Sequence, residues 1–461
     1  MAGAPPSSPG ATGRRRVLFI SADAVGPEMA GVGIRYWELA HVLSARAEVT
    51  LAAVRVEEMG ASPVRLVSFE PHSPRALRTH IAAADVIVCQ PQWPVVARWL
   101  RHCHGRVVYD LYDPETFETI ELFAHRRRAL RQFMVDLSVD RLNSALDSGD
   151  HFICSSEKQR DLWLGAMYSR RLIGPDAYDR DPSFRSVIDV VPFGLPDTPP
   201  ASSDPGAIAR AIPALRDGDE IVLWNGGIWN WLDAPGAVRA FALLAERRPR
   251  ARLVFMGATD NPAGQRASRE AREVAAERGL LDRAVFFNTQ WVPYSERADW
   301  LLAASCAVSA HEEHLETRFA FRTRLLDCFW AGLPVVCSDG DELAERVRRE
   351  GLGEAVPAGD EAALARGLEL VLERGRDHYA EALSRVAAQY AWPRVAEPLL
   401  RILDGTGEPR FGDIGRGPLQ SELGHRLRAG AYRLSHRGVR GGLAMMRRLR
   451  RPRGGTSSRP R

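Results

Sequence analysis

The residues best suited to chemistry lie between Glu316 and Val336, where an arginine-rich loop leads into one short helix. Apolar side chains in this helix recur at helical spacing, and Asp327 lies off that stripe with Arg324 three residues before it. The stripe consists of Leu325, Leu326, Phe329 and Trp330. An acid and a base at the N-terminal end of a helix, beside a strand end, can hold a sugar hydroxyl and a diphosphate. A surface pair between Arg324 and Asp327 is the alternative interpretation.

The same stretch resembles the donor-binding signature of the retaining nucleotide-sugar glycosyltransferases of family 4, which have the GT-B fold. That signature has a Glu, seven residues, a second Glu, a small-residue helix end and a Gly-x-Pro-Val-Val strand. Residues 332–336 match its end, and Asp327 takes the second acidic position. Phe319 occupies the first acidic position, so the resemblance implies that Glu316 or Glu313 supplies this acid from a longer loop.

A diglycine follows the strand predicted at 221–224, within the run GGIWNWLD. Two glycines allow the backbone to approach a ligand closely, and the next helix N-terminus can face an anion. The run resembles a variant of family 4 with a Gly-Gly-x-Trp-Asn-Trp loop and a Phe-Arg-Thr-Arg loop, in which Arg322 and Arg324 would replace the cations of the usual glycine turn. The resemblance implies donor binding by Gly226, Gly227, Trp229, Asn230, Arg322, Thr323, Arg324 and Asp327. A tight turn with aromatic packing is the alternative.

A glycine loop after the predicted first strand is the candidate acceptor or phosphate loop. Gly31 and Gly33 form a GxG pattern, which is a weak signal alone. Family 4 enzymes often place a glycine loop here, and Arg35 could meet an acceptor or a phosphate group. Arg35 could equally cap its own loop.

Tyr112 and Asp113 end a predicted strand of the first half, where relatives often carry a histidine near the anomeric carbon. A carboxylate here can stabilise positive charge on a sugar or accept a proton from the attacking hydroxyl. We therefore take Asp113, Tyr112 and Glu316 as the candidate catalytic residues. An acid followed by proline is also an ordinary turn start.

Strands and helices alternate twice along the chain, in two halves of similar size. Such alternation predicts parallel sheets covered on both faces. The predicted class is α/β, a GT-B fold with two facing Rossmann-like domains and a cleft between them. The predicted segments are a disordered start at 1–15, an N-terminal acceptor domain at 16–195, a linker at 196–218, a C-terminal donor domain at 219–405 and a basic tail at 406–461.

Composition and charge limit the classes of function that this chain can have. The 461 residues carry a net charge of +4, but residues 425–461 hold 12 arginines and no acid, so the remainder has 50 basic against 58 acidic residues. The tail could lie disordered in solvent, contact an anionic membrane or bind nucleic acid, and nothing that reads bases accompanies it. Six cysteines without paired spacing suit a reducing cytoplasm, with no disulfide framework and no zinc site.

The sequence thus predicts a cytoplasmic, retaining glycosyltransferase that moves a sugar from a UDP- or GDP-sugar to a hydroxyl acceptor. The acceptor could be a glycan, a lipid-linked group or a small molecule, in cell-surface polysaccharide, glycolipid or natural-product glycosylation. We expect no cofactor, no metal and no nucleic-acid partner, and the tail could add peripheral contact with an anionic membrane. A catalytically silent nucleotide-sugar binder or scaffold is the alternative.

Overall fold

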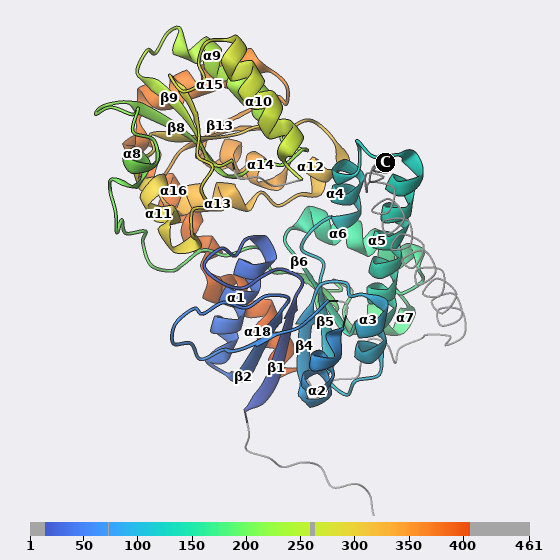
Figure 1. Ribbon diagram of the computed structural model, residues 1–461. Coiled ribbons are helices and arrows are strands. Elements are labelled where there is room, and N and C mark those ends of the chain that lie inside the picture. The colour runs from blue at the N-terminus through green and yellow to red at the C-terminus, as the bar shows by residue number, and fades with distance from the viewer. Residues whose placement is uncertain (1–13, 72, 259–262, 406–461) are drawn as a thin grey trace, which may run out of the picture. The chain divides into compact units, whose positions relative to one another are not determined.

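The computed structural model describes residues 14–71, 73–258 and 263–405, which form two α/β lobes (Figure 1). Each lobe contains one sheet whose strand pairings are all parallel in the described residues. The first sheet has seven strands in the order β3-β2-β1-β4-β5-β6-β7, and the second has six in the order β10-β9-β8-β11-β12-β13. The predicted α/β class with two Rossmann-like lobes is confirmed.

The first lobe alternates strands with helices. Its strands are β1 Arg15–Ser21, β2 Ala47–Ala53, β3 Arg65–Ser68, β4 Val86–Cys89, β5 Arg106–Asp110, β6 His151–Cys154 and β7 Ile188–Val190. Its helices are α1 Gly31–Ser44, η1 Pro74–Ala76, α2 Leu77–Ala83, α3 Pro94–Arg101, α4 Glu115–Leu122, α5 Arg128–Ser148, α6 Glu157–Ser169 and α7 Pro175–Arg180.

The second lobe follows the short helix α8 Ala207–Ala211 and repeats the pattern. Its strands are β8 Glu220–Gly227, β9 Ala251–Gly257, β10 Val285–Phe287, β11 Cys306–Ser309, β12 Val335–Ser338 and β13 Gly353–Val356. Its helices are α9 Ala234–Ala245, α10 Gln265–Glu277, η2 Tyr294–Glu296, α11 Arg297–Ala303, α12 Leu315–Phe319, α13 Thr323–Trp330, α14 Glu342–Glu350, α15 Glu361–Arg374, η3 Arg376–His378, α16 Ala380–Ala387 and η4 Ala388–Tyr390. The last described helices are α17 Trp392–Val395 and α18 Glu397–Asp404.

The central strands are apolar on both faces because helices cover both sides of each sheet. In β1, Val17 and Phe19 belong to one buried cluster, whereas Leu18 belongs to another. This alternation follows from the two-residue period of a strand. A strand buried on both sides reads as a continuous apolar run, which explains why the first strand was recognisable in the sequence.

The strand order reverses at one point in each sheet. β1 lies between β2 and β4 in the first sheet, and β8 lies between β9 and β11 in the second. In open parallel sheets, ligands bind beyond the carboxyl ends of the strands at such reversals. The residues that follow β1, β8 and β11 are therefore the ones to examine for a site.

The last described helices contact the first lobe, although the sequence analysis groups them with the second. Leu195 and Ala391 form an isolated parallel bridge, and the rings of Phe193 and Trp392 lie 5.0 Å apart. Arg401 of α18 also donates to Asp189 at 2.8 Å. The chain thus returns to the lobe in which it began.

Several predicted features fall outside the described part. These are residues 1–13 of the predicted start and the whole basic tail, 406–461, together with its proposed membrane contact. Within the described ranges, no helix combines the length and the apolar character that crossing a membrane requires.

A buried ion pair joins three elements of the first lobe. Arg35 of α1 donates through Nε and Nη2 to Asp110, the last residue of β5, at 2.7 and 3.1 Å. Its Nη2 and Nη1 atoms also donate to the carbonyls of Val191 and Pro192, just beyond β7, at 2.8 and 2.9 Å. Both charged side chains are fully buried, so either would be costly to leave alone.

We predict that breaking this pair destabilises the fold. Asp110→Asn or Arg35→Met alone should lower the free energy of unfolding by about 3–5 kcal/mol, because each leaves a buried group without its partner. The double variant Arg35→Met/Asp110→Leu should lose less than the sum of the two single losses. Urea denaturation measures all three, and single losses under about 1 kcal/mol would contradict the assignment.

Candidate functional site

The diglycine is the irregular, half-buried end of β8. The pairing of β8 with β9 shifts register between Trp224 and Gly227, and Gly226 has a φ of +100°. That φ is readily adopted only by glycine. A Cβ added at Gly226 would lie 3.8 Å from the guanidinium of Arg324, so the diglycine and this arginine are neighbours.

Arg324 is a partly buried cation without an acidic partner in the described residues. Its Nη2 donates to the Gly227 carbonyl at 2.8 Å, and its guanidinium lies 5.4 Å from the centre of the Trp224 ring. Its buried Nη1 atom has no hydrogen-bond partner among the described residues. Burial, and then the neighbouring Arg322, lower the pKa of Arg324 to about 9. An anion bound at the diglycine would supply the missing partner.

Arg322 is held differently, which corrects its predicted role. Its Nη1 and Nη2 atoms donate to the two carboxylate oxygens of Glu316 at 3.1 and 2.7 Å. Its Nε lies 3.8 Å from Asp341. The sequence predicts that Arg322 binds a diphosphate. In the structure, the carboxylates of Glu316 and Asp341 already balance the charge of Arg322. Arg322 therefore positions its loop, and Arg324 is the cation left for a ligand.

Glu316 is almost fully buried in α12, where Arg322 fixes both of its oxygens. The position eight residues before Asp327 holds Phe319, whose ring stacks on Phe117 of α4 with centroids 5.7 Å apart. The candidate for the first acidic position is thus present, but as a member of an ion pair.

A buried histidine that the sequence analysis did not select lies near these arginines. The ring Nε2 of His311 lies 3.2 Å from the Asp339 carbonyl. Burial, and then Arg322, lower the pKa of His311 to about 3. The ring is therefore neutral at physiological pH and can hydrogen-bond a ligand without adding charge.

The aromatic loop after the diglycine supports it. The rings of Trp229 and Trp231 stack with centroids 5.1 Å apart. The side-chain oxygen of Asn230 accepts from the backbone N–H of Ala267 at 3.1 Å, which caps α10. Donor binding through Asn230 is therefore not supported by its contacts, whereas Trp229 lies beside Gly227.

Asp327 pairs with Arg297 rather than with Arg324. Its Oδ1 accepts from Arg297 Nε at 3.1 Å, and the Arg297 guanidinium lies 3.6 Å from the centre of the Tyr294 ring. Arg324 instead reaches the Gly227 carbonyl, so the surface pair considered as the alternative is not formed. Thr323 is the first residue of α13, the helix that carries Arg324 and Asp327.

In the first lobe, an acid lies where the sequence analysis placed an anion. The Asp23 carboxylate lies 3.9 Å from the position of a Cβ on Gly31. Burial raises the pKa of Asp23, and hydrogen bonds from the backbone N–H groups of Val32 and Gly33 oppose that rise. A carboxyl group thus lies beside the start of α1, where the sequence predicts a phosphate loop, and its presence does not favour an anion there.

The predicted roles of Arg35 and Tyr112 are also corrected, because both side chains are buried. Arg35 is committed to Asp110 and to two carbonyls, so it cannot meet an acceptor. The Tyr112 ring lies 4.9 Å from the Arg35 guanidinium and 6.3 Å from the Phe193 ring. Both side chains support the site instead of lining it.

Asp113 and Glu118 form a half-buried pair of carboxyls at the end of β5 and in α4. Gln90 donates to Asp113 at 3.4 Å. Burial, with Glu118 next, raises the pKa of Asp113 well above its usual range. Burial, and then Glu316, raise the pKa of Glu118 to about 7, against the opposing effect of Arg322. Glu118 can therefore hold or transfer a proton near neutral pH, and the raised pKa of Asp113 makes its carboxylate a stronger base.

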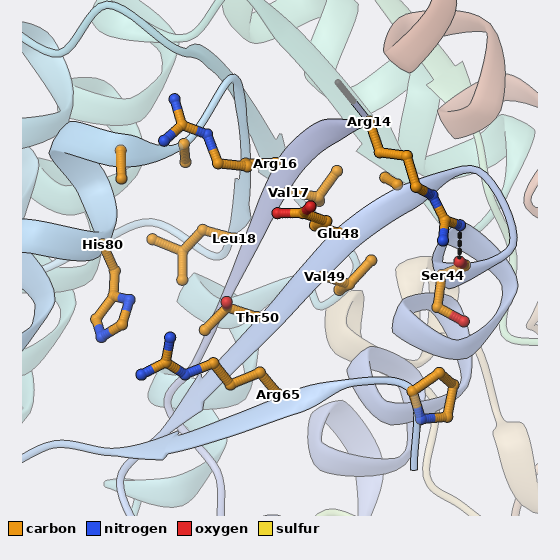
Figure 2. Close-up of a pocket in the computed structure, with 14 residues that line it drawn as sticks. Arg14, Arg16, Val17, Leu18, Ser44, Glu48, Val49, Thr50, Arg65 and His80 are labelled. Atoms are coloured by element: carbon orange, nitrogen blue, oxygen red, sulfur yellow. Dashed lines mark hydrogen bonds between the residues drawn. The ribbon is translucent and has the colours of Figure 1, made fainter. Parts of the chain in front are cut away.

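A hollow of about 480 Å³ lies elsewhere, at the amino ends of β1, β2 and β3 (Figure 2). It is lined by Arg16, Arg65 and His80 among others. Because it lies at the opposite end of these strands, it is separate from the candidate residues. No group of three metal-ligating side chains was found in the described ranges.

Comparisons with known proteins show what the chain is similar to. Residues 219–374 match the family model described as "Glycosyl transferases group 1". A stretch of 88 residues is 39% identical to the phosphatidyl-myo-inositol mannosyltransferase of Mycobacterium leprae. This match covers 18% of the present chain and 23% of the mannosyltransferase, so the chain matches about a quarter of that relative's length.

Solved structures resemble the chain over most of its length. WaaG, a glycosyltransferase involved in lipopolysaccharide biosynthesis, has a TM-score of 0.61 at 18% identity, covering 84% of this chain and 100% of WaaG. Anabaena HepE in complex with UDP-glucose has a TM-score of 0.62 at 14% identity, covering 84% of this chain and 99% of HepE. These likenesses show the fold, which is the two-lobed arrangement of GT-B glycosyltransferases.

Four residues near the candidate site were not among the candidates predicted from the sequence, namely Asp23, Glu118, Arg297 and His311. Asp23 and His311 each follow a buried strand by one or two residues, so the rule that sites gather at strand ends could have selected them. Glu118 and Arg297 lie on helices, and their importance comes from neighbours distant in sequence.

We predict a pH-dependent stability difference for Glu118→Gln. The pKa of Glu118 in the fold, about 7, lies above the ordinary value of 4.5, so its contribution is present at low pH and is lost as the pH rises through about 7. The variant should therefore gain stability relative to the native chain between about pH 5 and about pH 8. Melting temperatures at both pH values measure this, with Glu277→Gln on α10 as an exposed control. An equal change in the control would contradict the prediction.

Proposed function

We propose, on the premise that residues 219–374 belong to the group 1 glycosyl transferases, that this chain transfers a sugar from a nucleotide-diphosphate donor to a hydroxyl acceptor. One observation carries the proposal. Arg324 is a partly buried cation with no acidic partner in the described residues, and it lies against the backbone of the diglycine at the strand reversal. A diphosphate is the ligand chemistry that this arrangement suits.

The donor would bind across the carboxyl ends of β8 and β11. Arg324 and the backbone at Gly226 and Gly227 would contact the diphosphate, and Asp327 would accept from the ribose hydroxyls. A UDP- or GDP-sugar is the proposed donor, and the resemblance to HepE, solved with UDP-glucose, supports that class. His311, neutral because its pKa is about 3, could hydrogen-bond the sugar without repelling the developing positive charge.

The reaction would break the bond between the anomeric carbon and the diphosphate oxygen while the acceptor oxygen bonds to that carbon. Negative charge then grows on the diphosphate, where Arg324 would stabilise it. The hydroxyl group that receives the sugar must lose its proton. A carboxylate with a raised pKa is a stronger base, which favours Asp113 as the group that takes this proton. We propose retention of the anomeric configuration, as in the family that the sequence resembles.

A catalytically silent nucleotide-sugar binder is the second candidate. Phe319 stands in the first acidic position, and Glu316, the nearest replacement, is neutralised by Arg322. Such a protein would bind the donor as tightly but would not release its sugar.

We predict that Arg324→Met weakens nucleotide-diphosphate binding. Loss of a charge-assisted hydrogen bond worth about 1.5–3 kcal/mol corresponds to a dissociation constant raised about tenfold to a hundredfold. The melting temperature should hold or rise, because a buried cation without a partner is removed. Calorimetric titration with UDP and GDP measures the affinity, with Arg278→Met at the exposed residue just after α10 as the control. Unchanged affinity for both nucleotides would retire the diphosphate assignment.

A product analysis separates transfer from silent binding. The native chain, given a panel of UDP- and GDP-sugars with simple acceptors, should form a glycoside whose anomeric proton coupling shows the donor configuration. Asp113→Asn should reduce turnover by about a hundredfold or more with a smaller effect on donor affinity. Tight donor binding without transfer or hydrolysis for any donor would favour the silent binder, and an inverted product would exclude the retaining mechanism.

A further inference from the structure

Exposed apolar side chains lie on two neighbouring helices of the first lobe. Of the eight large apolar side chains exposed in the described residues, four lie at the start of α3 and of α5. They are Trp93, Val95, Leu130 and Phe133, with exposed fractions of 38%, 54%, 44% and 38%. We call this the α3–α5 face, together with Arg126, Arg127, Arg128 and Arg131. Soluble proteins seldom expose such side chains together unless they bind something.

The two helices that carry these side chains lie next to each other. α3 lies beside α5 (Figure 1), and Trp93 meets the Arg141 guanidinium of α5 at 4.5 Å from its ring centre. Leu130 precedes Arg141 by eleven residues, or about three helical turns, so both point to nearly the same side of α5. Phe133 lies three residues after Leu130, on the adjoining strip of the helix.

Cations accompany this apolar surface. The run HRRRALRQF at 125–133 contains four arginines and no acid. Arg126, Arg127 and Arg128 are exposed, and none of the four arginines forms an ion pair within the described part of the chain. Arg131 donates to the Ile120 carbonyl at 3.0 Å, which ties the start of α5 to α4. The run is thus anchored to the fold while its charges remain available.

We propose that the α3–α5 face docks on the surface of an anionic phospholipid membrane. Trp, Phe and Leu side chains partition into the region between headgroups and acyl chains, and adjacent arginines attract anionic headgroups. The partner must be anionic, so the chain's own tail, with 12 arginines and no acid between 425 and 461, is a poor occupant of this face. The proposal does not depend on glycosyl transfer.

Vesicle co-sedimentation of the full-length chain tests the proposal. Vesicles of phosphatidylcholine with phosphatidylglycerol should bind the native chain, and vesicles of phosphatidylcholine alone should bind it much less. Leu130→Ser/Phe133→Ser and Arg126→Ser/Arg127→Ser/Arg128→Ser should each weaken binding to the anionic vesicles by about tenfold or more. Because all these positions are exposed, the melting temperature should not fall.

Matched variants on other surfaces control for general stickiness and charge. Tyr168→Ser removes another exposed aromatic residue, and Arg278→Ser removes an exposed arginine of the second lobe. Unchanged binding by both multiple variants would overturn the proposal and assign any vesicle binding to another part of the chain. The proposal would also be overturned if only the arginine variant lost vesicle binding and lost binding to duplex DNA equally. That result would favour a general site for polyanions.

Discussion

The ion pair between Glu316 and Arg322 is the interaction on which the candidate site depends. It joins α12 to the residue just before α13, and Asp341 at the start of α14 lies 3.8 Å from the same guanidinium. A buried arginine with two carboxylates nearby has its charge balanced without any ligand. The loop from β11 to β12 is thereby shaped before a substrate arrives, and α13 is set with Arg324 toward the end of β8.

Arg322 and Arg324 are two residues apart, yet their environments assign them opposite roles. Arg322 faces acids, whereas Arg324 faces a carbonyl, an indole ring and the other cation. The repulsion between them contributes to the lowered pKa of Arg324. A bound anion would relieve both the desolvation and the repulsion, so the free energy of binding would include the removal of an unfavourable interaction in the free protein.

The first lobe shows the same division between support and chemistry. Arg35 and Asp110 neutralise one another in the core and fix the ends of β5 and β7, which leaves Asp113 and Glu118 as the carboxyls near the surface. Burial is the largest cause of the raised pKa of both carboxyls, followed by repulsion from Glu118 for Asp113 and from Glu316 for Glu118. Raised pKa values at a strand end are what a proton acceptor in an exposed cleft of this fold class requires.

The sequence by itself determined the fold class, because buried parallel strands read as apolar runs and the glycines mark turns that few other residues can form. It also singled out the diglycine and Asp113 as candidates, because both lie at or just after the carboxyl ends of apolar strands, where ligands of such sheets bind. Only the tertiary structure decided which charged groups are free. Arg35 and Arg322 have the right chemistry and spacing, but partners 75 residues away for Arg35 and six for Arg322 already occupy them. Spacing along a chain fixes which face of an element a side chain takes, whereas its partner is set by packing between elements.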